Sequence, residues 1–188
     1  VNWGDGTTTT GHTADASHEY TSNGIKQIVI SGDFPRIHFK DAIDEKKIIA
    51  IDNWGSGIWT SMNGAFTGCT KLTGKASDSP NLSSVTDMSE MFADAKLFNQ
   101  DISDWNTSNV TDMSSMFEDA TSFDQNLAAW DVGNVTDMSS MFKGISLSTA
   151  NYDAMLNAWS SSPVQTGVTL DGGGSIYCLG EVARAKLS

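Results

Sequence analysis

Asn109-Val-Thr-Asp-Met-Ser-Ser-Met-Phe117 recurs as Asn134-Val-Thr-Asp-Met-Ser-Ser-Met-Phe142, and a close copy, Ser84-Val-Thr-Asp-Met-Ser-Glu-Met-Phe92, precedes both. The three stretches align without gaps and begin 25 residues apart. A fixed period of this length is typical of repeat proteins, in which one unit buries its apolar face only against its neighbours. The sequence therefore predicts an array of 25-residue repeats.

A weaker copy lies before these three. Met62 and Phe66 precede Met88 and Phe92 by 26 residues, so we expect about four turns in the array. The methionines and phenylalanines recur at spacings of three and four within each copy, and the same residue returns in every copy. This pattern favours a continuous buried core over an exposed recognition surface.

The two halves of each repeat predict different local structures. Asp87, Asp112 and Asp137 stand just before Met-Ser-x-Met-Phe, a position that predicts an N-cap followed by a short helical or 3₁₀ turn. The runs from Phe98 to Ser103 and from Phe123 to Ala128 alternate apolar and polar residues, which predicts strands of a narrow parallel sheet, although runs this short also fit irregular extended turns.

The regions on either side of the repeats differ from them, and we expect three parts. Residues 1–52 read as a β-rich N-terminal cap or the remnant of a β module, 53–146 as the repeats, and 147–188 as a C-terminal cap with a helix, a strand and a second short helix. The predicted fold class is an α/β repeat solenoid with about four turns of 25–26 residues.

Composition narrows the function further. The net charge of −12 opposes the phosphate neutralisation on which nucleic-acid binding depends, so nucleic acid is a poor partner. No apolar stretch approaches the roughly 18 residues that a membrane-spanning helix needs, so we expect no insertion into a membrane. Cys69 and Cys178 lack the spacing of a zinc site and are expected to be free thiols.

The residues resemble a known family. Ala65-Phe66-x-Gly-Cys69-x-x-Leu72 looks like BspA-like leucine-rich repeats, and the Asn-Val-Thr-Asp-Met-Ser-x-Met-Phe block resembles the variant found in bacterial surface lipoproteins and other exported bacterial proteins. The start, Trp3-Gly-Asp-Gly6 with His18-Glu-Tyr20 and Gly24, is similar to the edge of PKD-like extracellular β-sandwich modules. The resemblance implies that the predicted solenoid is a leucine-rich-repeat-like, right-handed stack. It also implies an exported protein that acts in adhesion or partner recognition, and it carries over no catalytic residue.

No catalytic motif or metal-binding motif is present in the sequence. A glycosidase-like pairing of Asp101, Asp104 or Asp131 is the remaining catalytic alternative, and carboxylates that recur in a repeat are more simply explained as solvated or capping groups. The oxygen-bearing side chains of Asn99, Asp101, Asp124 and Asn126 would also suit calcium, whereas hydrogen bonding between neighbouring turns explains the same pattern without an ion. We therefore expect no catalytic residues, no metal site and no cofactor.

The interpretation is an extracellular, non-catalytic adhesion or protein-recognition module of a bacterial surface protein, acting as a monomer on a host or neighbouring-cell surface protein or glycan. A passive spacer or stalk and a carbohydrate-binding module are the alternatives. The candidate ligand-binding residues follow the predicted strands: Asn99, Asp101, Ser103, Trp105, Asp124, Asn126 and Trp130.

Overall fold

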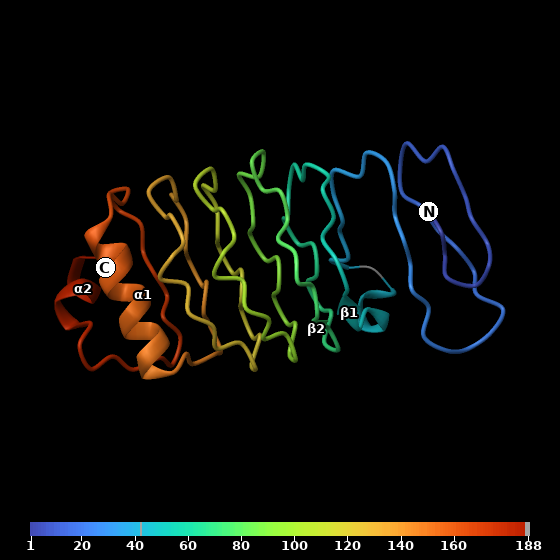
Figure 1. Cartoon of the computed structure of the whole chain (residues 1–188). Helices are drawn as coiled ribbons and strands as arrows, with labels where there is room; N and C mark the ends of the chain where they lie inside the picture. The colour runs from blue at the N-terminus through green and yellow to red at the C-terminus, as the bar shows by residue number, and fades with distance from the viewer. Residues whose placement is uncertain (42, 187–188) are drawn as a thin grey trace. The chain divides into compact units, whose positions relative to one another are not determined.

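Helices and strands are few in this protein, whose computed structural model describes residues 1–41 and 43–186. The chain divides into two compact units, Val1–Phe34 and Pro35–Ser188. The regular elements, labelled in Figure 1, belong to the second unit: the 3₁₀ helix η1 (Glu45–Lys47), strands β1 (Ala50–Ile51) and β2 (Thr73–Gly74), and helices α1 (Thr149–Ser161) and α2 (Glu181–Lys186). β1 pairs with β2 in parallel, with Ala50 opposite Thr73.

The predicted α/β leucine-rich-repeat-like solenoid is wrong. Between β2 and α1, the three matching repeats contain turns and irregular backbone in place of helices and strands. The runs from Phe98 to Ser103 and from Phe123 to Ala128 do not form a parallel sheet, and no helix follows Asp87, Asp112 or Asp137. The physical reason is that the side-chain oxygens of Asp101, Asn126 and Asp112 accept from the backbone amide two residues later. These local hydrogen bonds form turns, and the turns end each run before a strand or a helix can extend.

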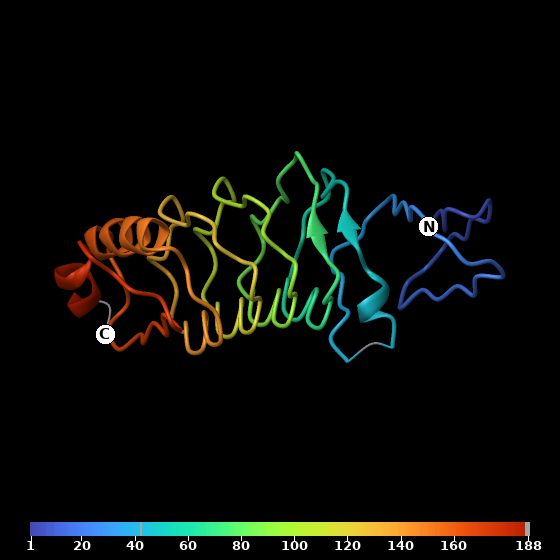
Figure 2. The same cartoon turned by 90° about the horizontal axis from the view of Figure 1, so that it is seen from below.

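Neighbouring repeats are instead joined by single backbone hydrogen bonds between residues about 25 positions apart in the chain. The amide of Met88 donates to the carbonyl of Asp112 at 2.9 Å, and the amide of Met113 donates to that of Asp137 at 2.9 Å. Isolated parallel bridges link Asp87 to Asp112 and Asp112 to Asp137. Figures 1 and 2 show the corresponding segments lying side by side. The backbone polar groups of these irregular segments therefore find partners in the next repeat.

Each Met-Ser-x-Met-Phe turn needs left-handed backbone at two places. The first is the x position, where φ is 55° at Glu90, 52° at Ser115 and 56° at Ser140. The second lies four residues later, with φ of 58° at Asp94 and 56° at Asp119. In the weaker first copy, both places are glycine, at Gly64 and Gly68, which adopt this conformation at no steric cost. The repeat thus depends on turn geometry more than on secondary-structure propensity.

Rows of identical aromatic side chains fill the interior. The rings of Phe92, Phe117 and Phe142 lie nearly parallel, with centroids 5.9 Å and 5.8 Å apart, and a second row joins Phe98 to Phe123 at 6.1 Å. All five rings are fully buried, and the methionines of the repeats are buried beside them. The prediction that the methionine and phenylalanine rows form the core is confirmed.

Helix α1 occupies the position after the last repeat. Ser148 is its N-cap, and Tyr152, Met155, Leu156 and Trp159 are buried, as the apolar spacing of this segment predicts. The Trp159 indole N–H donates to the carbonyl of Leu127 at 3.0 Å, just as Trp130 donates to Ile102 at 2.9 Å. The helix therefore continues the hydrogen-bonding pattern of the repeat with a different backbone.

A small cluster of polar and aromatic side chains connects three segments of the first unit. The His18 ring lies 2.7 Å from a carboxylate oxygen of Asp5 and stacks on Trp3 with ring centroids 5.0 Å apart. The Tyr20 hydroxyl donates to the Trp3 carbonyl at 2.9 Å. Hydrogen bonds from Thr7 and then from His18 hold the pKa of Asp5 well below its usual range. Within residues 1–52, which were predicted to be β-rich, the structure forms the two-residue strand β1 and isolated bridges from Asn2 to Thr8 and Val29.

Replacing Phe117 by alanine should lower the free energy of unfolding by about 3–5 kcal/mol, because the ring is fully buried and contacts the rings of Phe92 and Phe142. Urea denaturation followed by tryptophan fluorescence measures the loss. Leu97→Ala is the control, since this side chain is 53% exposed and its removal should change stability by no more than about 0.5 kcal/mol. Equal losses in the two variants would contradict the buried ring row.

Ser140→Val should cost about 1–2 kcal/mol of stability, because a β-branched side chain is disfavoured at the left-handed backbone of this residue, where φ is 56°. The matched control is Ser139→Val, since Ser139 is exposed and has an ordinary φ. Thermal unfolding of both variants tests the turn geometry. A similar melting temperature for the two would show that the left-handed turn is not required.

Candidate recognition site

The first pair of predicted binding residues serves to connect neighbouring segments. The Asn99 side-chain oxygen accepts from the Asp124 amide at 2.9 Å and from the Gln125 side chain at 2.7 Å. The Asp124 carboxylate in turn accepts from the Ser148 amide at 2.8 Å and from Asn151 at 2.9 Å. These two residues therefore form successive steps of one hydrogen-bonded row that ends on α1.

A second pair caps its own turn. The Asp101 carboxylate accepts from the Ser103 amide at 3.0 Å, and the Asn126 side-chain oxygen accepts from the Ala128 amide at 2.9 Å. These bonds with Ser103 lower the pKa of Asp101, so its carboxylate is charged at neutral pH. Asp101 and Asn126 are exposed, and Ser103 is half-buried. They remain accessible to a partner while they stabilise the turn.

The two tryptophans lie in the interior. Trp105 and Trp130 are each 3% exposed, and Trp105 packs edge-to-face against Trp54 with centroids 5.2 Å apart. They do not form the exposed aromatic row on which carbohydrate recognition would rely. Their burial shows that both side chains pack in the core.

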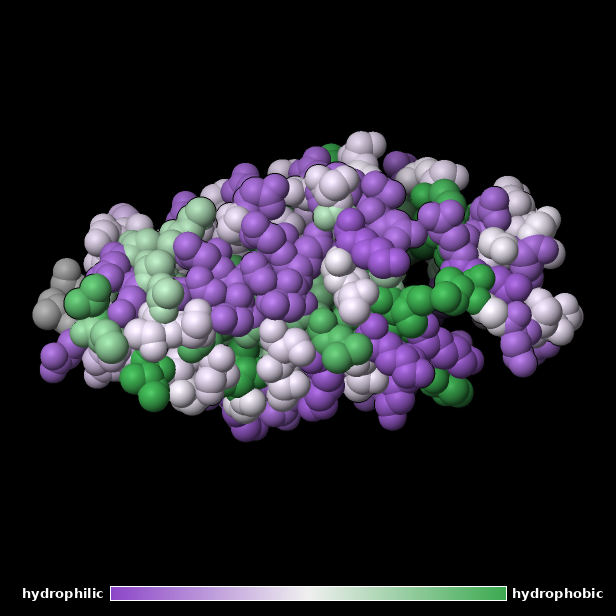
Figure 3. Space-filling view, turned by 60° about the horizontal axis from the view of Figure 1, so that its bottom comes forward, coloured by the Kyte–Doolittle hydropathy of each residue, from purple (hydrophilic) through white to green (hydrophobic). Residues whose placement is uncertain are grey.

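One polar hollow brings three of the seven predicted residues together. Asp101, Ser103 and Trp105 line a cavity of about 270 Å³ with residues of the preceding segment. The other lining residues are Ala76, Ser77, Asp78, Ser79, Gln100 and Asp104. Asn99, Asp124, Asn126 and Trp130 do not line it. Figure 3 shows that hydrophilic residues cover much of the surface over the repeats.

The hollow carries concentrated negative charge. Three carboxylates, those of Asp78, Asp101 and Asp104, line it without any lysine or arginine among the lining residues. Asp78 is fixed by the amides of Trp54 and Gly55, both at 2.8–2.9 Å to its oxygens, and the Ser79 hydroxyl donates to Asp104 at 2.6 Å. The carboxylates are thus held in place before any ligand arrives, which reduces the entropy cost of binding.

The arrangement does not fit a metal ion. Within residues 1–41 and 43–186, no three His, Cys, Asp or Glu side chains converge closely enough to hold one. Calcium needs six to eight oxygen ligands around a single point. The carboxylates of the hollow are suited instead to a larger cation that can bond several of them, such as a guanidinium or an ammonium group.

Sequence reasoning missed the half of the hollow formed by residues 76–79. These residues precede the first complete copy of the repeat and match no residues of the repeated block. Two spacings could have identified them. Met62 and Met88 are 26 residues apart, one more than in the other repeats, and Ser79 lies 25 residues before its hydrogen-bond partner Asp104. An inserted residue in a regular array indicates a place where the surface departs from the pattern.

Three lysines form ion pairs with carboxylates outside the hollow. Lys40 lies 2.8 Å from Glu90, Lys96 lies 2.7 Å from Asp94, and Lys143 lies 2.6 Å from Glu118. The hydrogen bond from Lys143 lowers the pKa of Glu118. Because both partners of each pair are substantially exposed, we expect these pairs to contribute little to stability.

Residues 42–169 match the family described as "Mycoplasma protein of unknown function, DUF285", and the chain belongs to this family. Membership of this family is consistent with the predicted similarity to bacterial surface repeat proteins. The more specific prediction of BspA-like leucine-rich repeats is not confirmed. Neither the curated proteins nor the solved structures include a match to this chain. In the described part of the chain, none of the helices has the length and apolar character required to cross a bilayer.

Removing the charge of Asp124 should loosen α1 in a pH-dependent way. Burial raises the pKa of this carboxyl group, but hydrogen bonds from Ser148 and Asn151 outweigh that effect, so its pKa is lower in the folded protein than in the unfolded chain. The stability contributed by Asp124 is therefore present above its unfolded pKa and is lost as the pH falls through its folded pKa.

Asp124→Asn should accordingly be less stable than the wild type at pH 7, and the difference should shrink as the pH is lowered toward 3. Urea denaturation at a series of pH values measures it. Asp131→Asn removes an exposed charge while leaving an amide oxygen to accept from the Gly133 amide, and it serves as the control. A stability difference that does not change with pH would contradict this account of Asp124.

Proposed function

We propose that this chain is an extracellular, non-catalytic adhesion or protein-recognition module of a bacterial surface protein, related to the BspA-like surface proteins. Its binding site is the polar hollow, and its ligand is a positively charged side chain, arginine above all, presented by a protein on a host or neighbouring cell. The observation that carries the proposal is the group of three carboxylates in a hollow whose lining includes no basic residue.

The surroundings of the hollow support recognition over a passive spacer. Its carboxylates and hydroxyls are already oriented by hydrogen bonds, since the Trp54 amide donates to Asp78 and the Ser79 hydroxyl donates to Asp104. Ala76 also lines the hollow and is half-buried, so some apolar surface lies beside the carboxylates. A guanidinium group can bond carboxylates at its edge while its face lies on an apolar or aromatic surface.

Electrostatics supports the same partner. The net charge of −12 should attract basic proteins at a distance and increase their rate of association. This attraction should weaken with salt, because charges that lie at the surface are screened over about 8 Å at physiological ionic strength. Carbohydrate binding is less well supported, since both predicted aromatic platforms are buried.

The test is a peptide array of 15-residue sequences that vary in arginine and lysine content, probed with the purified protein. We expect saturable binding to arginine-containing peptides, and we expect Asp101→Asn with Asp104→Asn to weaken it at least about tenfold, because charge-assisted hydrogen bonds are lost. Both asparagines keep an oxygen that can accept from Ser103 and Ser79, so the hollow should keep its shape.

Asp131→Asn is the matched control, since it removes one negative charge outside the hollow and should leave affinity nearly unchanged. A glycan array and equal melting temperatures for all variants complete the comparison. Unchanged binding in the double variant, or binding to glycans alone, would contradict the proposal.

A further inference from the structure

Two asparagines of this chain stand directly before a glycine, Asn23 before Gly24 and Asn63 before Gly64. Asparagine is among the chemically labile residues. Its side-chain carbonyl carbon is attacked most readily by the backbone nitrogen of a following glycine, which has no side chain to hinder the approach. The two pairs have the same local chemistry, so a difference in their reactivity must come from the contacts that the fold gives them.

The Asn63–Gly64 pair is held by hydrogen bonds and close packing. The Gly64 amide donates to the Ser89 carbonyl at 2.9 Å, and the Asn63 side-chain nitrogen donates to the Ser89 hydroxyl at 2.7 Å. The His38 ring covers the turn, since a Cβ placed on Gly64 would lie only 2.9 Å from it. The Gly64 nitrogen and the Asn63 side chain are therefore not free to approach each other.

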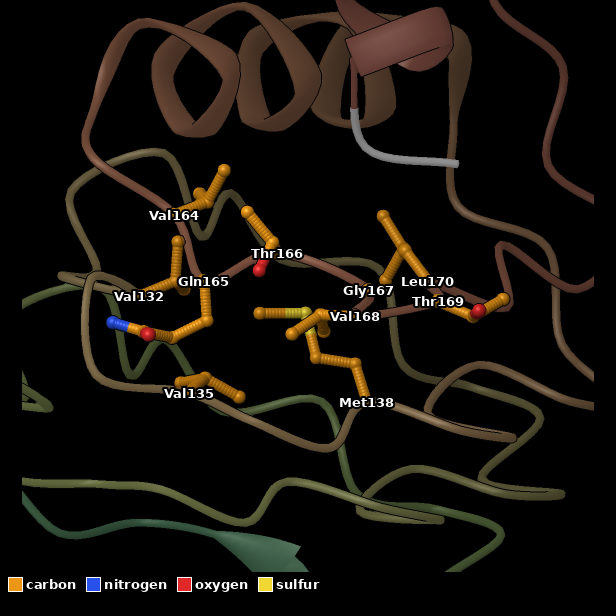
Figure 4. Close-up of a pocket in the computed structure, with 10 residues that line it drawn as sticks. All are labelled: Val132, Val135, Met138, Val164, Gln165, Thr166, Gly167, Val168, Thr169 and Leu170. Atoms are coloured by element: carbon orange, nitrogen blue, oxygen red, sulfur yellow. The ribbon is translucent and has the colours of Figure 1, made fainter.

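Amide side chains in the last part of the array are also held. The Asn134 side-chain nitrogen donates to the Ser108 carbonyl at 2.7 Å. Gln165, labelled in Figure 4, donates to the Gly133 carbonyl at 2.7 Å. An amide group that is bonded in this way must first break its hydrogen bond before it can react. Contacts between neighbouring segments thus protect these side chains.

The Asn23–Gly24 pair has no such protection. Both residues are exposed, and the side chain of the following residue, Ile25, is 83% exposed. Within residues 1–41 and 43–186, neither Asn23 nor Gly24 has a hydrogen-bond partner. A Cβ placed on Gly24 would meet no atom within 4 Å. The Asn23 side chain and the Gly24 nitrogen are therefore free to reach each other.

We propose that Asn23 is a site of spontaneous deamidation through a succinimide, and that the fold protects Asn63 from the same reaction. The Gly24 nitrogen bonds to the side-chain carbonyl carbon of Asn23 as its amide proton is lost. The bond from that carbon to the side-chain nitrogen breaks, and the nitrogen takes up a proton and leaves as ammonia. Water then opens the ring at one of its two carbonyls, which gives aspartate or isoaspartate. Water is the only reactant besides the chain.

The products differ from asparagine in charge and in backbone length. Either product adds one carboxylate to the first unit, and isoaspartate also inserts one carbon into the main chain between residues 23 and 24. The new carboxylate lies close in the chain to Lys26, whose ammonium donates to the Ser22 hydroxyl at 3.1 Å. The polar hollow contains no residue of the first unit, so this inference is independent of the proposed function.

The test is incubation of the folded protein at mildly alkaline pH, followed by trypsin digestion and tandem mass spectrometry. Cleavage after lysine releases residues 1–26 and 48–71, each with one of the two Asn-Gly pairs. We expect deamidation at Asn23 to be at least about tenfold faster than at Asn63, because two hydrogen bonds protect the second pair. An enzymatic assay for isoaspartate should detect that product at residue 23. A digest of protein that was not incubated corrects for deamidation during digestion.

Two controls come from the same peptides. Asn2 and Asn53 each precede a tryptophan, whose side chain hinders the backbone nitrogen, and both should remain unmodified. In guanidinium chloride, Asn23 and Asn63 should react at similar rates, because unfolding removes the contacts of the second pair. Asn23→Gln should abolish the modification at this position, since the longer side chain would have to form a larger ring.

Similar rates at Asn23 and Asn63 in the folded protein would overturn the inference, and so would a faster reaction at Asn63. A difference that persists in the unfolded protein would assign it to the local sequence in place of the fold, with the same consequence. Deamidation of Asn23 without any isoaspartate would exclude the succinimide, because direct hydrolysis yields aspartate alone.

Discussion

The hydrogen bonds between backbone groups 25 residues apart are the constraint on which the rest of this structure depends. An irregular segment cannot satisfy its own amides and carbonyls as a helix does, and groups that are buried without partners are costly. Here the turn of each repeat donates to the next, as Met88 does to Asp112 and Met113 does to Asp137. The spacing of the repeat is therefore a hydrogen-bond register, and each segment needs a neighbour to be stable.

The rows of like side chains follow from that register. When backbones of the same conformation are aligned residue by residue, the same side chain must lie beside itself, as the rings of Phe92, Phe117 and Phe142 do. The polar residues on the outside are occupied in the same way. Asn99 and Asp124 bond neighbouring segments, and Asp101 and Asn126 cap turns. A regular part of the array thus uses most of its polar groups for its own structure.

The proposed binding site lies where the regular pattern ends. The polar hollow borders the place where the spacing between repeats is 26 residues in place of 25. At this place, acidic side chains of two neighbouring segments line one hollow. The proposed recognition therefore uses an irregular position, whereas the regular positions of the array bond to one another.

Several features could be predicted from particular residues. The apolar spacing of Tyr152, Met155, Leu156 and Trp159 predicted α1, and the recurrence of methionine and phenylalanine predicted the core, because burial of apolar side chains follows from their periodicity. The α/β fold class was wrong, since alternation in a six-residue run cannot distinguish a strand from a series of capped turns. The residues predicted to bind a ligand do not lie together in the structure. Asp101 lines the hollow, whereas Trp130 is buried in the interior.

The sequence by itself determined the 25-residue register, the composition of the core and the helix that follows the repeats, because these depend on spacing and on the chemistry of single residues. Only the tertiary structure decided which polar side chains remain available. Asp78 and Asp104 are separated by 26 residues in the chain and line the same hollow. The side-chain oxygen of Asn99, in contrast, already accepts a hydrogen bond from the Asp124 amide. Whether a polar side chain is free to bind a partner depends on contacts between segments that are distant in the chain, and a local sequence pattern does not predict these contacts.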